Sequence, residues 1–487
     1  MRRAVLFGAG LFGAAALLSG CMVGPSYRTP PALPSAALKL REAQAAHVAP
    51  SPLPPRWWRL FDDSDLDRLI EKALVHNTDL RQAAANLQRA RAALAEKGAA
   101  RLPTGTASAE YDRERTAALG LGTSGTGGLR PLTTDFYSLG YDASYEVDLF
   151  GGVARSIQAA RADYQAAQAQ VDAARVAVAA ETASAYVDAC SFAAQAAVAR
   201  ETARLQADTF DLTNRMFEGG RSTERDVQQA RETVEQVNAQ VPTFEAERRA
   251  SLYALAVLTG DPPAEVDAAA ARCAAPPSTK QPIPVGDGQA LLARRPDVRA
   301  AERTLAADTA RIGVATAELY PSITLAGFVN LGAPKIGDLS RNQAFTYSVG
   351  PLISWNFPFN GAARARVRES RAQAQASLAA FDGTVLRALQ ETEQALARLS
   401  GAIEHERALA RAADASQRAA ELSETRFRAG SDNFLQLLTA ERDRAQTRAA
   451  LAQAQADRAQ DQISLFKALG GGWEAAPQVA AAPLPRR

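Results

Sequence analysis

The chain has 487 residues, and its 55 Lys and Arg nearly balance its 53 Asp and Glu, leaving a formal charge of +2. This balance argues against a nucleic-acid-binding surface, and the length allows two or three ordinary domains. Aromatic residues make up only 6%, while alanine and glutamine are abundant. This composition favours long, closely packed helices over a large aromatic core.

The first 21 residues are organised like a bacterial secretion signal. Arg2 and Arg3 precede a mostly apolar run, which ends in Leu-Ser-Gly-Cys at Cys21. A basic start, a short apolar stretch and small residues at a cut site indicate a cleaved signal rather than a spanning helix. The junction resembles a lipobox, so we expect residues 1–20 to be removed and Cys21 to carry S-diacylglycerol and an N-acyl chain such as palmitate. The alternative is an ordinary signal peptide with a chance cysteine.

The mature sequence contains two similar halves, with matching segments about 210 to 218 residues apart. The segment from Asn77 to Pro103 matches that from Arg295 to Pro321, and RMFEGG, YSLGYDASYEVDLFGG and LAVLTG each have a counterpart in the second half. Such self-similarity indicates a duplicated structural unit. We therefore expect structural repeats at 61–260 and 288–470, joined by a linker at 261–287.

Each repeat contains two segments in which apolar and polar residues alternate. They lie at about 104–112 and 136–148 in the first repeat, and at 322–331 and 345–357 in the second. Period two predicts strands with one apolar and one polar face. A half-exposed soluble strand would look the same, but the tyrosines and the membrane tether favour an apolar face toward lipid.

Four strands are too few for a membrane barrel, which needs about eight. Open sheet edges are not tolerated in hydrocarbon. If the strands enter a membrane, several chains must therefore share one barrel, and the sequence predicts an oligomer without fixing its order.

The rest of each repeat is predicted to be helical, with long helical rods spanning 153–258 and 360–469. The 66 residues from Val153 to Glu218 contain no Pro or Gly, and a helix of that length would reach about 100 Å. Apolar or small residues follow a coiled-coil seam in this rod. We expect each rod to turn at glycines and return as a second helix. The expected interruptions are a kink at Pro242 in the first return helix and breaks near Gly383 and Gly401 in the second rod.

No catalytic constellation is apparent. His47, His76 and His405 are isolated, and none has a second His or Cys at ligand spacing, so we expect neither an enzyme nor a metal site. Cys190 and Cys273 could pair, although two isolated cysteines are more often free and buried. Two clusters of arginines are expected to be surface bases on helices and not a nucleic-acid-binding patch: Arg294 and Arg295, and Arg364, Arg366 and Arg368.

The lipobox, the start CMVGPSYRTP, the WW-x-x-F sequence at Trp57 and Trp58, and the duplicated strand–rod–turn units resemble TolC/OprM-type outer-membrane factors. The nearest group is the lipoprotein branch that serves resistance-nodulation-division efflux systems. The resemblance implies a mostly helical homotrimer with a 12-stranded β-barrel in the outer membrane and an α-helical tunnel across the periplasm. It also implies an equatorial region from the N-terminal segment (21–60), the linker and the C-terminal tail (471–487).

The same resemblance implies a passive duct for small toxic compounds, fed by an inner-membrane pump through a periplasmic adaptor protein. The family's adaptor-docking tips fall on Gly219, Gly220, Arg221, Ser222, Gly430 and Ser431. Its periplasmic gate, an acidic ring that would favour cations, has Glu218, Asp226 and Asp432 as candidates. These acids could instead simply complement helix N-termini.

Two other functions remain open at this point. The same architecture serves type I protein secretion in some relatives, although the lipobox and the GPSYRTP start favour efflux. A periplasmic coiled-coil tether without a pore is the alternative of another class, and the alternating strands argue against it. The sequence does not identify the exported compounds.

Overall fold

The computed structural model describes residues 22–30, 40–44, 48–116, 132–279, 281–357 and 359–477. The expected lipidation site, Cys21, lies outside the described residues. The chain divides into two compact units. The first comprises residues up to 29, 89–165 and 302–379, and the second comprises 30–88, 166–301 and 380 onward. Among the described residues, none of the helices is both long and apolar enough to cross a membrane.

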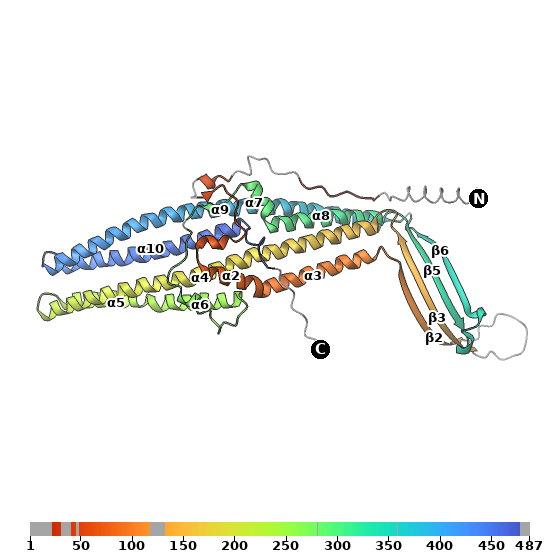
Figure 1. Cartoon of the computed structure of the whole chain (residues 1–487), viewed down its shortest axis with the longest axis horizontal. Helices are drawn as coiled ribbons and strands as arrows, with labels where there is room; N and C mark the ends of the chain where they lie inside the picture. The colour runs from red at the N-terminus through yellow and green to blue at the C-terminus, as the bar shows by residue number, and fades with distance from the viewer. Residues whose placement is uncertain are drawn as a thin grey trace, which may run out of the picture. The chain divides into compact units, whose positions relative to one another are not determined.

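The duplicated unit expected from the sequence is present in the order of the elements (Figure 1). In both halves a short helix leads into a helix of 22 residues, two strands, a very long helix and a return helix. The long helices contain 67 and 68 residues. The first half comprises α2 (Ser64–His76), α3 (Thr78–Ala99), β2 (Thr104–Thr116), β3 (Leu132–Val147), α4 (Gly152–Glu218), α5 (Glu224–Asn238) and α6 (Gln240–Leu258). The second comprises α7 (Gly288–Arg294), α8 (Pro296–Ala317), β5 (Ser322–Ala333), β6 (Phe345–Ser354), α9 (Gly361–Arg428) and α10 (Phe434–Ala468).

The strands of the first unit form one antiparallel sheet in the order β2-β3-β5-β6. The central pairing therefore joins the two halves of the chain, with Tyr141 opposite Val329. The hairpin β2–β3 is longer than the alternation suggested, because pairing continues to Thr116 opposite Leu132. β6 is shorter, since it ends at Ser354 and the apolar residues after it lie outside the strand.

The helices follow the sequence expectation except at their interruptions. The first return helix breaks at Ala239, and Pro242 lies in the first turn of α6, where its missing N–H is not needed. The expected breaks near Gly383 and Gly401 are wrong, because α9 runs through both residues without interruption. A single glycine weakens a helix by only about 1 kcal/mol relative to alanine, which packing along the rod can offset.

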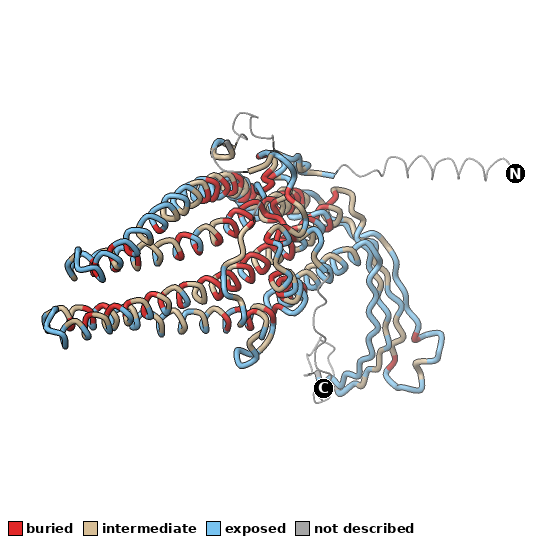
Figure 2. Tube along the Cα trace, turned by 60° about the vertical axis from the view of Figure 1, so that its left-hand side comes forward, coloured by how far each residue is buried: buried red, intermediate tan, exposed pale blue. Residues whose placement is uncertain are grey.

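The core of the second unit gathers segments that lie far apart in the sequence. Trp57 and Trp58 are almost completely buried, and Trp57 stacks on Phe466 of α10 with ring centroids 4.6 Å apart. Short strands β1 (Val48–Ala49) and β4 (Ile283–Pro284) pair in parallel beside this core. Figure 2 shows the buried residues concentrated in the helices, while the four long strands are largely exposed.

The structure settles one question about this core that the sequence left open and corrects one expectation. Cys190 and Cys273, which could pair or stay free, form a disulfide between α4 and the segment after α6. Arg295 is not a surface base: it is 7% exposed and donates to Asp297, Glu391 and the carbonyl oxygen of Ala468. A buried guanidinium is tolerated only when its donors are satisfied in this way.

Candidate functional site

One face of the four-stranded sheet is largely apolar on every strand, and its charged residues in the described strands, Arg113, Arg115 and Asp135, lie together at one end of β2 and β3. Residues directly opposite in an antiparallel sheet share a face, so Ala107, Tyr141, Val329 and Tyr347 lie in one row. These side chains stay exposed in the single chain, with Tyr347 at 71%. A contiguous apolar surface of this kind marks a contact with another protein or a membrane. The other large apolar and aromatic residues of the face are Tyr111, Tyr137, Leu139, Tyr145, Val147, Ile323, Leu325, Leu331, Phe345, Val349 and Ile353.

The opposite face of the same sheet is polar, and its charged residues within the described strands are all acidic. Asp142 is typical: it lies between Thr106 and Phe328. A polar face backing an apolar one is the pattern of a strand between lipid and water. The acids of this face are Glu110, Asp112, Glu114, Asp142 and Glu146.

The sheet is open at both sides, because β2 and β6 each have only one neighbour in the described chain. An edge strand exposes unpaired N–H and C=O groups that invite another strand. A sheet with a lipid-like face therefore needs further strands from elsewhere before it can enter hydrocarbon.

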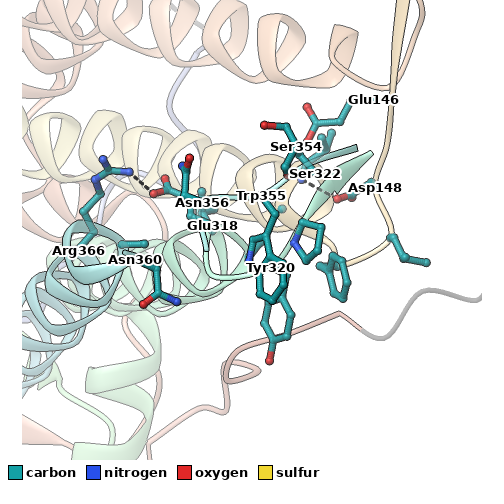
Figure 3. A pocket seen from close by; sticks show the side chains of 18 of the residues that line it. Glu146, Asp148, Glu318, Tyr320, Ser322, Ser354, Trp355, Asn356, Asn360 and Arg366 are labelled. Atoms are coloured by element: carbon teal, nitrogen blue, oxygen red, sulfur yellow. Dashed lines mark hydrogen bonds and ion pairs between the residues drawn. The ribbon is translucent and has the colours of Figure 1, made fainter. Parts of the chain in front are cut away.

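A cavity of about 720 Å³ lies where the strands of the first unit meet its helices (Figure 3). Asp148 accepts hydrogen bonds from the backbone N–H groups of Val153 and Ala154 at 3.0 and 2.7 Å. It thereby caps the start of α4. Across the cavity Arg366 of α9 pairs with Glu318, which follows α8. Asp148 thus links the end of β3 to α4, and the Arg366–Glu318 pair links α9 to the segment between α8 and β5.

Aromatic side chains surround the same junction. Phe150 and Tyr320 stack with ring centroids 4.6 Å apart, and Trp355 stacks on Phe357 at 4.7 Å. The Trp355 indole donates to the Leu319 carbonyl oxygen at 3.1 Å. Aromatic rings with a polar tip favour the boundary between lipid and water.

The first helical turn joins α4 to α5 in the second unit. Gly220 has φ +67°, a conformation that favours glycine. Arg221 donates its backbone N–H to the Met216 carbonyl oxygen at 2.8 Å, which closes the helix end. Thr223 then caps α5 through a reciprocal capping box with Asp226.

The second turn, from α9 to α10, repeats this construction. Gly430 has φ +76°, and Ser431 donates to the Arg426 carbonyl oxygen at 2.9 Å. Asn433 caps α10 in a capping box with Gln436. Aligning the sequences RMFEGG (Arg215–Gly220) and RFRAGS (Arg426–Ser431) places Gly430 opposite Gly219. The positive φ angles instead make Gly220 the structural equivalent of Gly430, one residue away from the sequence alignment.

The three gate candidates lie at these turns but differ in their surroundings. Glu218 accepts a hydrogen bond from Asn214 at 3.1 Å, and Asp432 pairs with Arg426 at 2.8 Å. Partial desolvation acts to raise the pKa of Asp226, but hydrogen bonds from Thr223 and Ser222 outweigh it and lower the pKa below its ordinary value. The structure thus uses each acid locally within one chain.

A buried ion pair that the sequence reading missed lies further along α10. Glu441 and Arg444 are 2% and 6% exposed and pair with each other, and Gln206 of α4 donates to Glu441 at 3.4 Å. Desolvation raises the pKa of Glu441 above its ordinary value, while Arg444 acts in the opposite direction. The i, i+3 spacing was visible in the sequence, but its burial was not.

Among the described residues, no group of three or more His, Cys, Asp or Glu is arranged to hold a metal ion. The functional surfaces are thus the two faces of the sheet and the two helical turns. They offer contact, passage and assembly rather than a site for bond chemistry.

Comparisons with known proteins also indicate a protein of passage and assembly rather than of bond chemistry. A family model described as "Outer membrane efflux protein" matches residues 69–261 and 288–471. Nodulation protein T of Rhizobium leguminosarum bv. viciae is 32% identical over 466 residues, covering 95% of this chain and 93% of its own length. The antibiotic efflux pump outer membrane protein ArpC of Pseudomonas putida is 32% identical over 472 residues, covering 94% of both chains. The solved structure of the outer-membrane channel OprN has a TM-score of 0.86 at 34% identity, covering 93% of this chain and 100% of that one.

Proposed function

Since the chain belongs to the outer membrane efflux protein family and is an outer-membrane channel of an efflux system, we propose that three copies form the exit duct of a tripartite drug-efflux pump. The family resemblance expected from the sequence is confirmed, as are the fold class and the placement in the outer membrane. The protein is a channel and not an enzyme.

The observation that carries the assembly proposal is the open four-stranded sheet. One face is apolar and exposed, and the edge strands β2 and β6 lack a second neighbour in the described chain. Three copies would supply twelve strands, with β2 of one chain beside β6 of the next. This closure removes both edges, which hydrocarbon demands. The acidic face would line the water-filled interior, and the helices would continue the duct through the periplasm.

The domain roles follow from this assembly. Repeats 61–260 and 288–470 would each contribute two strands and one helical hairpin to the wall. Segments 21–60, 261–287 and 471–487 would form the equatorial region, which agrees with the packing of Trp57 and β4 in the core of the second unit. Cys21 would bear the lipid chains that attach each copy to the outer membrane.

The helical turns would dock the periplasmic adaptor, which links the duct to a resistance-nodulation-division pump. Gly219, Gly220, Arg221, Ser222, Gly430 and Ser431 are the contact residues in this proposal. All lie within two residues of a glycine, where backbones can approach closely. Arg221 and Gly430 also lie near each other: a Cβ at Gly430 would be 4.0 Å from an Arg221 guanidinium nitrogen.

Glu218, Asp226 and Asp432 are the proposed gate acids at the same end. Three copies would place each acid in a ring, which attracts cations and repels anions. Asp432 is the proposed responder to opening, because it lies in the turn itself and pairs with Arg426 in the last turn of α9.

The cargo proposed is small toxic compounds rather than proteins. The antibiotic efflux relative supports this choice over type I secretion. A tether without a pore does not require the acidic, polar face that backs the apolar one.

A matched pair of substitutions on β6 tests the proposal. Val349 is on the apolar face and Ser348 on the acidic face of the same strand. Val349→Arg should cost about 2–4 kcal/mol if it faces the middle of the bilayer, and should strongly reduce trimers recovered from the outer membrane. Ser348→Arg should assemble normally and alter ion selectivity in planar bilayers. Equal tolerance of both variants, a monomer by native mass spectrometry, or bilayers without conductance would contradict the duct.

A further inference from the structure

The segment just after Cys21 is held in a seat on the first unit. Arg155 of α4 is 3% exposed, and its guanidinium donates to the carbonyl oxygens of Val23 and Gly24 at 3.2 and 3.1 Å and to the Ser26 hydroxyl at 3.4 Å. A buried cation is costly unless its donors are satisfied. The segment therefore supplies the acceptors that make burial of the Arg155 guanidinium tolerable, and Arg155 in turn holds the segment in place.

Two further contacts fix the segment, here called the strap (Met22–Tyr27), against α8. Gly24 lies directly on Gly313, where an added Cβ would come within 2.5 Å of the Gly313 Cα. The Tyr27 hydroxyl donates to Glu302 at 2.9 Å, and the Arg303 guanidinium lies 5.5 Å from its ring centroid. Gly24 and Tyr27 are thus both held against the same helix.

The strap begins at the junction of strands and helices. Val23 donates its N–H to the Phe150 carbonyl oxygen at 3.2 Å, and Met22 packs so closely on Gly151 that an added Cβ there would lie 2.6 Å from the methionine side chain. Phe150 in turn stacks on Tyr320, which lies two residues before β5. The Trp355–Phe357 pair lies at the same junction, lining the same cavity.

We infer that Arg155 is a positioning residue that seats the lipid-bearing end of the chain beside the strand ends, so that the acyl chains enter the membrane next to the sheet. One peptide bond joins Cys21 to Met22, so the modification site is tethered within one residue of the junction. Aromatic rings at such a boundary mark the level of the membrane interface. The inference rests on the lipidation and outer-membrane placement proposed above, and adds that the anchor is fixed in position rather than hanging on a free tail.

Trypsin cleavage after Arg28 measures how firmly the strap is held. Arg28 follows the strap and is exposed, so cleavage there reports local release. In the purified full-length protein, Arg155→Met should raise the initial cleavage rate at Arg28 by about tenfold or more, because release no longer breaks three charged hydrogen bonds. Arg155→Lys, which retains one donor group, should restore part of the protection.

Two controls separate the seat from general loosening. Cleavage after Arg341, which lies between β5 and β6 and is exposed, should stay unchanged in Arg155→Met. Arg161→Met alters an exposed arginine of the same helix and should leave both rates unchanged. Gly24→Val changes the strap alone, and should raise cleavage at Arg28 even if Arg155→Met fails to fold.

Each outcome bears on a separate part of the inference. Equal cleavage at Arg28 in wild type, Arg155→Met and Gly24→Val overturns the seat, as does an equal rise at Arg341. Mass spectrometry of the released N-terminal peptide should show acyl groups on residue 21, and an unmodified peptide overturns the lipid-positioning role. Bilayer conductance of the wild type tests the duct independently of both results.

Discussion

The two helical hairpins have the same backbone plan but different chemistry. Each long helix ends at a glycine with positive φ, Gly220 or Gly430, and each return helix starts with a capping box. The duplicated sequence has therefore kept the local signals that turn the chain. The equivalence of the two turns shows that a turn needs only a few residues of the right type.

The return helices differ in what they bury. α5 buries Val227, Ala230 and Thr233 before the helix breaks at Ala239, whereas α10 continues for 35 residues and buries the Glu441–Arg444 pair. The return helix of the first hairpin is thus interrupted in its backbone, whereas that of the second is continuous but buries an ion pair. A buried pair is stable only while both partners are present, so the second hairpin should be the more sensitive to mutation.

Removing one member of the buried pair should have the largest effect. Arg444→Met leaves Glu441 buried without its counter-charge, and we expect a loss of about 3–5 kcal/mol in the free energy of unfolding. Urea unfolding in detergent at neutral pH measures it. Arg442→Met is the matched control in the same helix, since Arg442 is exposed and makes only a 3.4 Å bond to Thr233.

The double variant Glu441→Leu with Arg444→Met tests the reason for that loss. Apolar replacement of both partners should bring stability back to within about 1 kcal/mol of the wild type, or above it. If Arg444→Met alone is as stable as Arg442→Met, the pair is not a point of sensitivity and the contrast between the hairpins fails.

The turn glycines should show equal, intermediate effects in both hairpins. An L-residue in the left-handed region costs about 1–2 kcal/mol, so Gly220→Ala and Gly430→Ala should each lower stability by that amount. Gly219→Ala should be nearly neutral, because its φ is not positive and an added Cβ meets only ordinary contacts at 3.5 and 3.7 Å. If Gly219→Ala lowered the free energy of unfolding as much as Gly220→Ala, Gly219 rather than Gly220 would be the equivalent of Gly430.

The N-caps should give a smaller loss, again equal in the two hairpins. Thr223→Ala and Asn433→Ala each remove the side-chain acceptor of a capping box and should cost about 1 kcal/mol. Amide hydrogen exchange in the first turns of α5 and α10 locates the effect. Loss of protection in only one hairpin would show that tertiary packing, and not the cap, holds the other turn.

The parts of the molecule that could be predicted from sequence are those specified by local patterns. Period two identified all four long strands, and the absence of Pro and Gly identified α4, because both signals act within a few residues. The helix break at Ala239 was anticipated from Pro242 for the same reason. The expected helix breaks at Gly383 and Gly401 were wrong because the effect of a glycine on a helix depends on the packing around it, which the residue type does not reveal.

The features that could not be predicted depend on contacts between distant segments. The Cys190–Cys273 bond spans 83 residues, and cysteine spacing alone does not determine pairing. Arg295 was expected to be a surface base, and nothing in the sequence singled out Arg155. The burial of both depends on segments more than 90 residues away in sequence. The acidic face of the sheet was implicit in the alternation. All of its acids lie on β2 and β3 of the first repeat, and the register of β3 against β5 was needed to show which residues of the second repeat share that face.

The smallest predicted difference between the hairpins is acid sensitivity. Asp226 has a pKa below its ordinary value of 3.8 in the folded chain, so its contribution is present above pH 3.8 and is lost as the pH falls through the lowered value. The equivalent partner in the second capping box is Gln436, which does not titrate. Amide exchange in the first turn of α5, normalised to intrinsic rates, should therefore accelerate as the pH is lowered below 3.8, while that of α10 stays constant. Asp226→Gln should make the two turns alike at every pH, and a pH-independent first turn in the wild type would show that the carboxylate contributes nothing to the cap.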